Sequence, residues 1–277
     1  AMLYHYFRWE ENPRWHHALA LGLAFGWATL IRPVNGLFIL LPLFHFVLAP
    51  GGRERLGKLM QHLPHLLFVA VGALVFISLQ LAYWKHVTGQ WVYFSYSDER
   101  FWWQYPHVLD GLFSYRKGLL LYAPVMAFGF LGLWQLCRQH RGVGLAVTLF
   151  LAIYMYVIFS WWAWWYGGSI GMRAMIDVYP ALAIGMAAFL HWVFNLNFPA
   201  RLPAGITTIL LFGVLAWFGW LKVWQQRIWV VNWDGNTKES YWRGFLALEY
   251  VPGIDTTFVT PDYDGRLRTG IENGTGY

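Results

Sequence analysis

Long apolar stretches alternate with short polar ones along most of the chain. Most of these stretches are near the roughly 20 residues that a helix needs to cross a bilayer. We expect seven of them, at residues 16–31, 34–49, 63–84, 119–137, 143–162, 174–194 and 203–222. The pattern therefore predicts an all-α polytopic membrane protein with about seven transmembrane helices.

The first two stretches are short and are separated only by Arg32 and Pro33. Proline cannot donate a backbone hydrogen bond, and it disfavours helix at the residue before it. The whole segment 16–49 is too long for one ordinary span. Two short helices joined by a tight turn are therefore favoured over one helix broken at this point.

The polar segments predict a transmembrane region over residues 1–222, with a loop at 85–118, and a tail at 223–277. Short connections at 51–58 and 138–141 are basic, and short basic loops belong in the cytoplasm. The loop and the tail then lie on the extracytoplasmic side, together with the turns at 32–35 and 164–173. Because the unusual polar residues gather on that side, we expect the protein to work there.

Composition supports a membrane protein, because 58% of residues are hydrophobic and only 12% are charged, against about 25% charged in soluble domains. The net charge of +6 favours anionic lipid headgroups or phosphates. No basic cluster stands apart from the spans, which argues against a nucleic-acid partner. The single cysteine, Cys137, excludes an internal disulfide and a multi-cysteine metal site. The sequence begins at Ala1 without a signal-peptide pattern, so we expect it to be a fragment with an upstream part.

Three basic residues are candidates for binding phosphate or for structural roles. Arg116 and Lys117 precede the stretch at 119–137, where a forked guanidinium and an ammonium could hold a phosphate near the headgroups. They could equally anchor a helix end by snorkelling. Arg32 lies near membrane depth, where an ionisable side chain is a functional candidate, a helix-end anchor or a structural partner for an acid.

The acidic candidates are Asp98 and Glu99 in the loop. Each could act as a base, as a metal ligand or as a partner for Arg100. His62 and His65 could place two rings on one face, but no third ligand is apparent, so no metal site is expected.

The segment "WWYGGSIGMRAMID", residues 164–177, combines aromatic residues, two glycines and a charged pair. Gly167 and Gly168 allow a sharp turn or a close approach to a ligand. Arg173 and Asp177 are four residues apart, which makes them neighbours on a helical face. On the residues alone, a structural ion pair beside an aromatic belt is favoured.

Four stretches carry a resemblance to a known family. They are "LIRPVNGLFILLPL" (30–43), "GQWVYFSYSDERFWWQYPHVLDGLFSYRKGLLLYAPV" (89–125), "WWAWWYGGSIGMRAMIDVYPALA" (161–183) and "WDGNTKESYW" (233–242). Together they resemble bacterial polytopic glycosyltransferases of the GT-C class, in particular the group related to protein mannosyltransferases and to Rgt-type lipopolysaccharide glycosyltransferases. The resemblance covers most of the chain and corresponds to the C-terminal portion of such proteins.

The resemblance implies an enzyme of the bacterial inner membrane that acts on the extracytoplasmic face. Such enzymes transfer a sugar from a polyprenyl-phosphate carrier to a lipid, glycan or protein acceptor. The reaction needs a base for the acceptor hydroxyl and positive charge for the departing phosphate. The family's usual catalytic Asp lies in the first extracytoplasmic loop, but the segment 32–35 contains no acid. The resemblance therefore leaves the activity of this chain alone open; it fixes no cofactor, although a divalent metal would be compatible with it.

Carried onto this sequence, the resemblance ranks the candidate residues. It makes Arg116 and Lys117 the first candidates for binding phosphate, with Arg32 and Arg173 second. Asp98 and Glu99 become candidates on the acceptor or metal side. The remaining residues would shape one wall of the site: Trp165, Tyr166, Gly167, Gly168 and Asp177.

Two other functions remain in competition with the enzyme. A transporter or flippase of a lipid-linked or anionic solute should show internal repeats and broken helices at the membrane midplane. No convincing repeat is present, and the charged residues cluster at one face. A noncatalytic scaffold would use the loop and the tail to bind partners. The sequence favours the enzyme.

Overall fold

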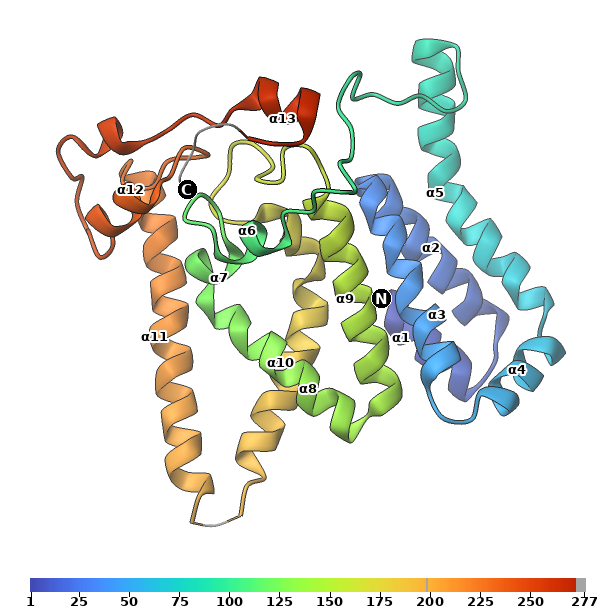
Figure 1. Ribbon diagram of the computed structural model, residues 1–277. Helices are drawn as coiled ribbons and strands as arrows, with labels where there is room; N and C mark the ends of the chain where they lie inside the picture. The colour runs from blue at the N-terminus through green and yellow to red at the C-terminus, as the bar shows by residue number, and fades with distance from the viewer. Residues whose placement is uncertain (198, 273–277) are drawn as a thin grey trace. The chain divides into compact units, whose positions relative to one another are not determined.

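The computed structural model describes residues 1–197 and 199–272. This part of the chain is helical, as predicted, and contains no strand; one isolated bridge pairs Phe101 with Trp161 (Figure 1). The chain forms two compact units, the first from residues 1–97 and 139–152 and the second from 98–138 and the residues from 153 onward. These units follow the contacts within the chain; the division into a transmembrane region and a tail at residue 222 stays a prediction.

Within residues 1–197 and 199–272, four helical segments are long and apolar enough to cross a membrane. They are α5 (Pro64–Thr88), α9 (Arg141–Phe159), η3 with α10 (Arg173–Phe194) and α11 (Arg201–Arg227). A bent pair, Pro33–Leu48 with Gly52–Gln61, would make a fifth. The described residues therefore support a multi-pass membrane protein with four or five candidate spans, and the predicted seven are not confirmed.

The stretch expected at 119–137 is divided into three elements. They are α7 (Leu119–Tyr122), η2 (Pro124–Met126) and α8 (Ala127–Gln139). Pro124 lacks a backbone N–H and disfavours helix at Ala123, so the chain breaks there. None of the three pieces is long enough to span a bilayer alone.

The break expected at Arg32 and Pro33 is present. α2 (Trp15–Ile31) ends before Arg32, whose backbone is extended with φ −149°. The short helices η1 (Pro33–Ile39) and α3 (Leu40–Leu48) follow. α5 continues to Thr88, four residues beyond the predicted end of its span at residue 84.

In the first unit, α1 (Met2–Glu11) and α5 both pack against α2. The contact between α2 and α5 is close because glycines face each other across it. A Cβ on Gly72 would lie 2.6 Å from the carbonyl oxygen of Leu19, and one on Gly22 or Gly26 would overlap a carbonyl oxygen of α5. Small residues of this kind, spaced four apart, allow helix backbones to approach closely within membranes.

We expect Gly26→Ala to destabilise the first unit by about 1–3 kcal/mol, because the added methyl group has no room against Ala73. The measurement is the thermal midpoint of the purified protein in detergent. Gly213→Ala on α11 is the matched control, since a Cβ there meets nothing within 4 Å. Equal midpoints for the two variants would contradict the close helix contact.

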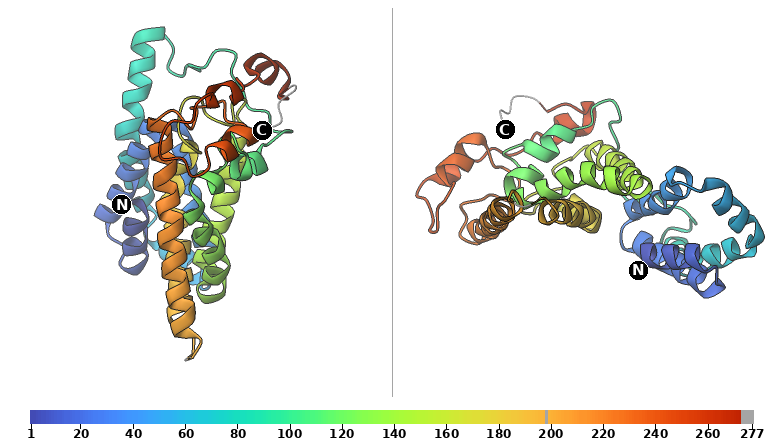
Figure 2. Two further views of the ribbon diagram at one scale, coloured as in Figure 1. Left: turned by 90° about the vertical axis from the view of Figure 1, so that its left-hand side faces the viewer. Right: turned by 90° about the horizontal axis from the view of Figure 1, so that it is seen from below.

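In the second unit, α10 and α11 lie side by side (Figure 2). Loops and short helices continue from the ends of its long helices: α6 (Val108–Phe113), α12 (Lys238–Arg243), η4 (Ile254–Thr257) and α13 (Tyr263–Thr269). We call residues 98–118, 160–172 and 228–272 of this unit the loop layer.

Candidate functional site

The loop layer joins segments that are far apart in the sequence. α9 ends at Phe159, η3 begins at Arg173 and α11 ends at Arg227, so these segments begin or end at the same end of the unit. Backbone hydrogen bonds tie the segments together. The amides of His107 and Ser169 donate to the carbonyls of Phe159 (2.9 Å) and Trp233 (3.3 Å).

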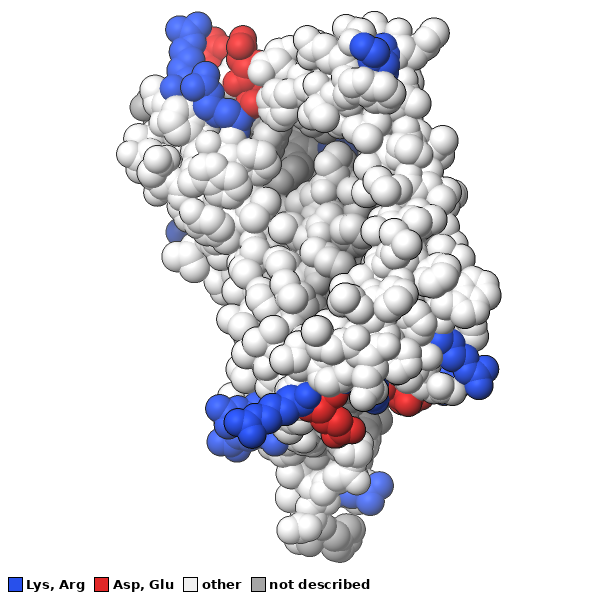
Figure 3. All heavy atoms as spheres, turned by 90° about the vertical axis from the view of Figure 1, so that its right-hand side faces the viewer, with Lys and Arg blue, Asp and Glu red and all other residues white. Residues whose placement is uncertain are grey.

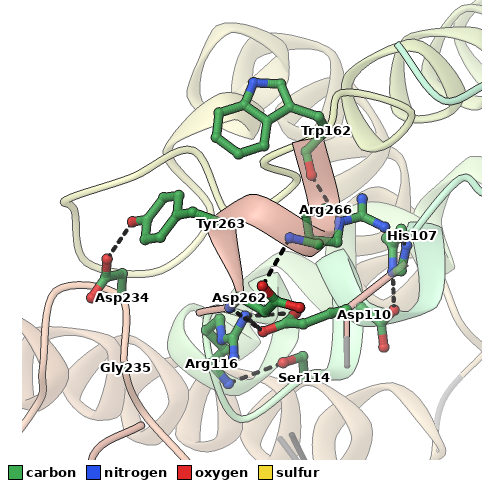
Figure 4. Close-up of polar contacts among 12 residues, drawn as sticks. His107, Asp110, Ser114, Arg116, Trp162, Asp234, Gly235, Asp262, Tyr263 and Arg266 are labelled. Atoms are coloured by element: carbon green, nitrogen blue, oxygen red, sulfur yellow. Dashed lines mark hydrogen bonds and ion pairs between the residues drawn. The ribbon is translucent and has the colours of Figure 1, made fainter. Parts of the chain in front are cut away.

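Arg116 is buried within this layer, with 1% of its surface exposed. Its Nη1 atom donates to both carboxylate oxygens of Glu272, at 2.8 and 2.9 Å, and the Glu272 side chain is 2% exposed. The guanidinium also lies 5.1 Å from the ring centre of Trp165, and Ser114 accepts a hydrogen bond from its backbone N–H (Figure 4). Arg116 therefore joins the loop at 114–118 to the tail.

Lys117 is fully buried next to it. Its Nζ atom donates to the carbonyl of Gly167 and, at 3.1 Å, to the hydroxyl of Ser169. Burial lowers the pKa of Lys117 from 10.5 to about 7; the carboxylate of Asp234 opposes this shift, and the positive charges of Arg173 and Arg116 add to it. Lys117 thus binds the turn at 167–169, and its ammonium group loses a proton more readily than that of an exposed lysine.

A third buried cation, Arg266 of α13, contacts both the segment at Trp162 and the segment at His107 (Figure 4). Its Nε donates to the carbonyl of Trp162 (2.9 Å), and its Nη1 donates to the carbonyl of Gly270 and lies 2.6 Å from Nε2 of His107. His107 Nδ1 lies 2.6 Å from a carboxylate oxygen of Asp110. Because a guanidinium can only donate, these two contacts fit a His107 imidazole that donates from Nδ1 to Asp110 and accepts at Nε2 from Arg266.

The conspicuous motif at 233–242 also contributes to this network. The Asp234 carboxylate, 7% exposed, accepts a hydrogen bond of 2.6 Å from the Tyr263 hydroxyl. Burial and this hydrogen bond raise the pKa of Tyr263. Asn236 Nδ2 donates to the carbonyl of Arg116 (3.2 Å), and Thr237 caps α12.

The aromatic-glycine segment makes the expected sharp turn. Tyr166 and Gly167 both have positive φ, +56° and +61°, and a Cβ on Gly168 would lie 2.7 Å from the ring of Trp233. Trp164 and Trp165 are fully buried. These two indoles are therefore part of the packing of the loop layer and do not belong to a lipid-facing aromatic belt.

The expected ion pair between Arg173 and Asp177 does not form. Residues Arg173–Val178 make a 3₁₀ helix, in which side chains three apart share a face and side chains four apart do not. Asp177 instead accepts a hydrogen bond of 3.4 Å from the Tyr154 hydroxyl. Arg173 is exposed, and no side chain or carbonyl within the described residues pairs with its guanidinium.

Arg173 lies on the wall of an apolar groove of about 230 Å³ in the second unit. The groove extends between the ends of η3, α7 and α11. Its apolar walls include Leu119, Tyr122, Ile170, Met172, Ile176 and Val223. An exposed guanidinium beside an apolar groove at a helix end is an arrangement that suits an amphiphile with an anionic head.

Asp98 and Glu99 are not among the residues that line this groove. Asp98 is exposed, and Glu99 accepts a hydrogen bond of 2.9 Å from the indole of Trp162. Arg32 belongs to the first unit and caps the end of α2. Among residues 1–197 and 199–272, no three His, Cys, Asp or Glu side chains are arranged to hold a metal ion.

Sequence reasoning missed several members of the network. Their sequence signals were weak: His107 and Asp110 are three apart before a short helix, and Glu272 is a lone acid near the end of the sequence. Comparison with protein-family models, with curated proteins and with solved structures finds no match. The family resemblance and the roles of the site residues therefore stay predictions.

We expect Glu272→Gln to destabilise the loop layer by about 3 kcal/mol, because it removes the carboxylate charge that pairs with the buried Arg116. The measurement is chemical unfolding in detergent, followed by tryptophan fluorescence. The double variant Arg116→Gln with Glu272→Gln should recover most of the loss. Glu249→Gln, an exposed acid of the same layer, is the control; a loss of the same size there would refute the assignment.

The lowered pKa of Lys117 predicts that the stability of the protein depends on pH. Between pH 7 and pH 10.5 the unfolded chain holds the lysine proton and the folded chain releases it, so the free energy of unfolding rises with pH across this window and is flat below it. The neutral amine still carries two N–H groups for its two acceptors. The thermal midpoint of the wild type minus that of Lys117→Met, measured in detergent across this range, should rise. A constant difference would show that Lys117 titrates normally.

Proposed function

We propose that the chain is part of a membrane glycosyltransferase that moves a sugar from a polyprenyl-phosphate carrier to an acceptor on the extracytoplasmic face of the bacterial inner membrane. The resemblance of four stretches to GT-C enzymes supplies the reaction class. The single observation that supports it in the structure is the exposed guanidinium of Arg173 on the wall of an apolar groove.

The groove has the chemistry that a lipid phosphate requires. Its walls are mostly apolar, so they favour the first hydrocarbon units of a polyprenyl chain. Arg173 presents forked donors that suit phosphate oxygens, and its charge would stabilise the phosphate as it leaves the sugar. Because its guanidinium has no partner among the described residues, binding phosphate would break no contact there.

The groups around Arg173 have separate tasks in this proposal. Lys117 holds the turn at 167–169 that precedes Arg173 in the groove wall. Arg116 is paired with Glu272 inside the layer, so its own predicted contact with phosphate would require that pair to open. Of the two acidic candidates, Asp98 is the exposed one and is the proposed base for the acceptor hydroxyl; Glu99 is held by Trp162.

We expect Arg173→Ala to lower kcat/KM for transfer from a polyprenyl-phosphate sugar by about ten- to a hundredfold, the effect of removing a hydrogen bond to a charged group. The assay uses native membranes in which the protein replaces its own chromosomal copy. Arg173→Lys should retain part of the activity, because it keeps the charge but loses the fork.

Arg268→Ala is the matched control, an exposed arginine of the loop layer outside the groove. It should leave transfer unchanged. Transfer that survives Arg173→Ala at the wild-type rate would remove the basis of the proposal.

A further inference from the structure

The helix α4 (Gly52–Gln61) of the first unit has no role in the glycosyltransferase proposal. It follows α3 after a bend of 117° and leads within three residues into the candidate span α5. None of its residues is buried. A ten-residue helix with no buried side chain needs some other surface to stabilise it.

One side of α4 is apolar and uncovered. Leu56, Leu59 and Met60 follow the i, i+3, i+4 spacing of a helical face, and Leu63 lies in the turn between α4 and α5. Leu56 is 52% exposed, Met60 63% and Leu63 49%. Two large apolar side chains of α4, Leu56 and Met60, are therefore exposed on one face, and Leu63 in the following turn is exposed as well.

Another side of α4 is held by the protein. Lys58 Nζ donates to the carbonyl of Glu10 (2.6 Å), and Arg55 Nη1 pairs with the carboxylate of Glu10 (3.1 Å). These contacts attach α4 to α1 and fix its rotation, with the apolar face turned away from α1. Arg53, at the edge of the apolar face, is exposed, and within the described residues its guanidinium has no partner.

We propose that α4 lies in the plane of the bilayer interface, with its apolar face at the acyl boundary and Arg53 bound to anionic phospholipid headgroups. An amphipathic helix with apolar residues on one face and basic residues beside them binds membranes in this way. The bilayer is the occupant because α4 is joined through a short turn to the candidate span α5, and the outward surface of α5 forms an uncharged band (Figure 3).

A deeper, re-entrant position for α4 is disfavoured by its charges. Arg53, Glu54, Arg55 and Lys58 lie within ten residues, and each charge at the centre of a bilayer costs at least about 2.5 kcal/mol. At the interface the same charges stay hydrated, while the apolar face leaves water. Arg53 then meets the headgroups of the leaflet, while Arg55 and Lys58 remain bound to Glu10.

The test uses the whole chain, with Cys137→Ser, reconstituted into phosphatidylcholine vesicles. Single cysteines at Leu56→Cys or Met60→Cys carry an environment-sensitive fluorophore, and Glu54→Cys and Gln61→Cys on the polar side are the matched controls. We expect lipids brominated near the headgroup end of the acyl chain to quench the first two probes, and aqueous iodide to quench the controls.

Either of two other outcomes would overturn the proposal. Iodide quenching of all four probes would place α4 in water. Shielding of the first two probes from both quenchers would mean that protein, from a second copy or another part of the complex, covers the face.

The headgroup contact is tested by comparing quenching by brominated phosphatidylglycerol and brominated phosphatidylcholine at equal content. The ratio should exceed one for the Met60→Cys probe, and Arg53→Gln should lower it by up to about fivefold, the effect of one basic residue near an anionic surface. Glu54→Gln should not lower it. A ratio unaffected by Arg53→Gln would refute the headgroup contact.

Discussion

Three buried cations determine how the loop layer is built. Arg116, Lys117 and Arg266 each have 1% or less of their surface exposed, and a buried charge without partners is costly. Each cation therefore requires carbonyl, carboxylate or imidazole groups, and these come from distant segments: Glu272, Gly167 and His107. Satisfying the charges brings the loop before α7, the turn after α9 and the tail together.

Arg173 differs from these three cations because it is exposed. The three buried cations point inward to protein groups, whereas the 3₁₀ geometry of Arg173–Val178 separates Arg173 from Asp177. The turn that Lys117 holds then continues into the wall of the apolar groove. The hydrogen-bonded loop layer thus adjoins a guanidinium that lies beside an apolar surface, the arrangement that we propose binds a lipid phosphate.

The features that could be predicted from the sequence are those encoded locally. Apolar length indicated the helical class, Arg32 and Pro33 indicated the break after α2, and Gly167 with Gly168 indicated the turn. The division of the stretch at 119–137 was also local, because Pro124 lies inside it, but hydropathy alone did not reveal it.

The rest depends on contacts between distant residues. Arg116 and Glu272 are separated by 156 positions, and no spacing rule connects them. The failure of the Arg173 and Asp177 pair has a different cause, because the sequence did not distinguish a 3₁₀ helix from the first turn of an α-helix. In both cases the sequence was sufficient to identify the charged candidates. Which of them are buried and which are exposed depends on how the chain folds.

Photo-crosslinking measures most directly whether the groove beside Arg173 accepts a lipid phosphate. A polyprenyl phosphate with a diazirine in its first isoprene unit is added to the protein in membranes, and the labelled peptides are identified by mass spectrometry. We expect labelling at groove residues such as Ile170, Met172 and Val223, and we expect excess unlabelled polyprenyl phosphate to abolish it. Labelling confined to other surfaces, or unaffected by the competitor, would contradict it.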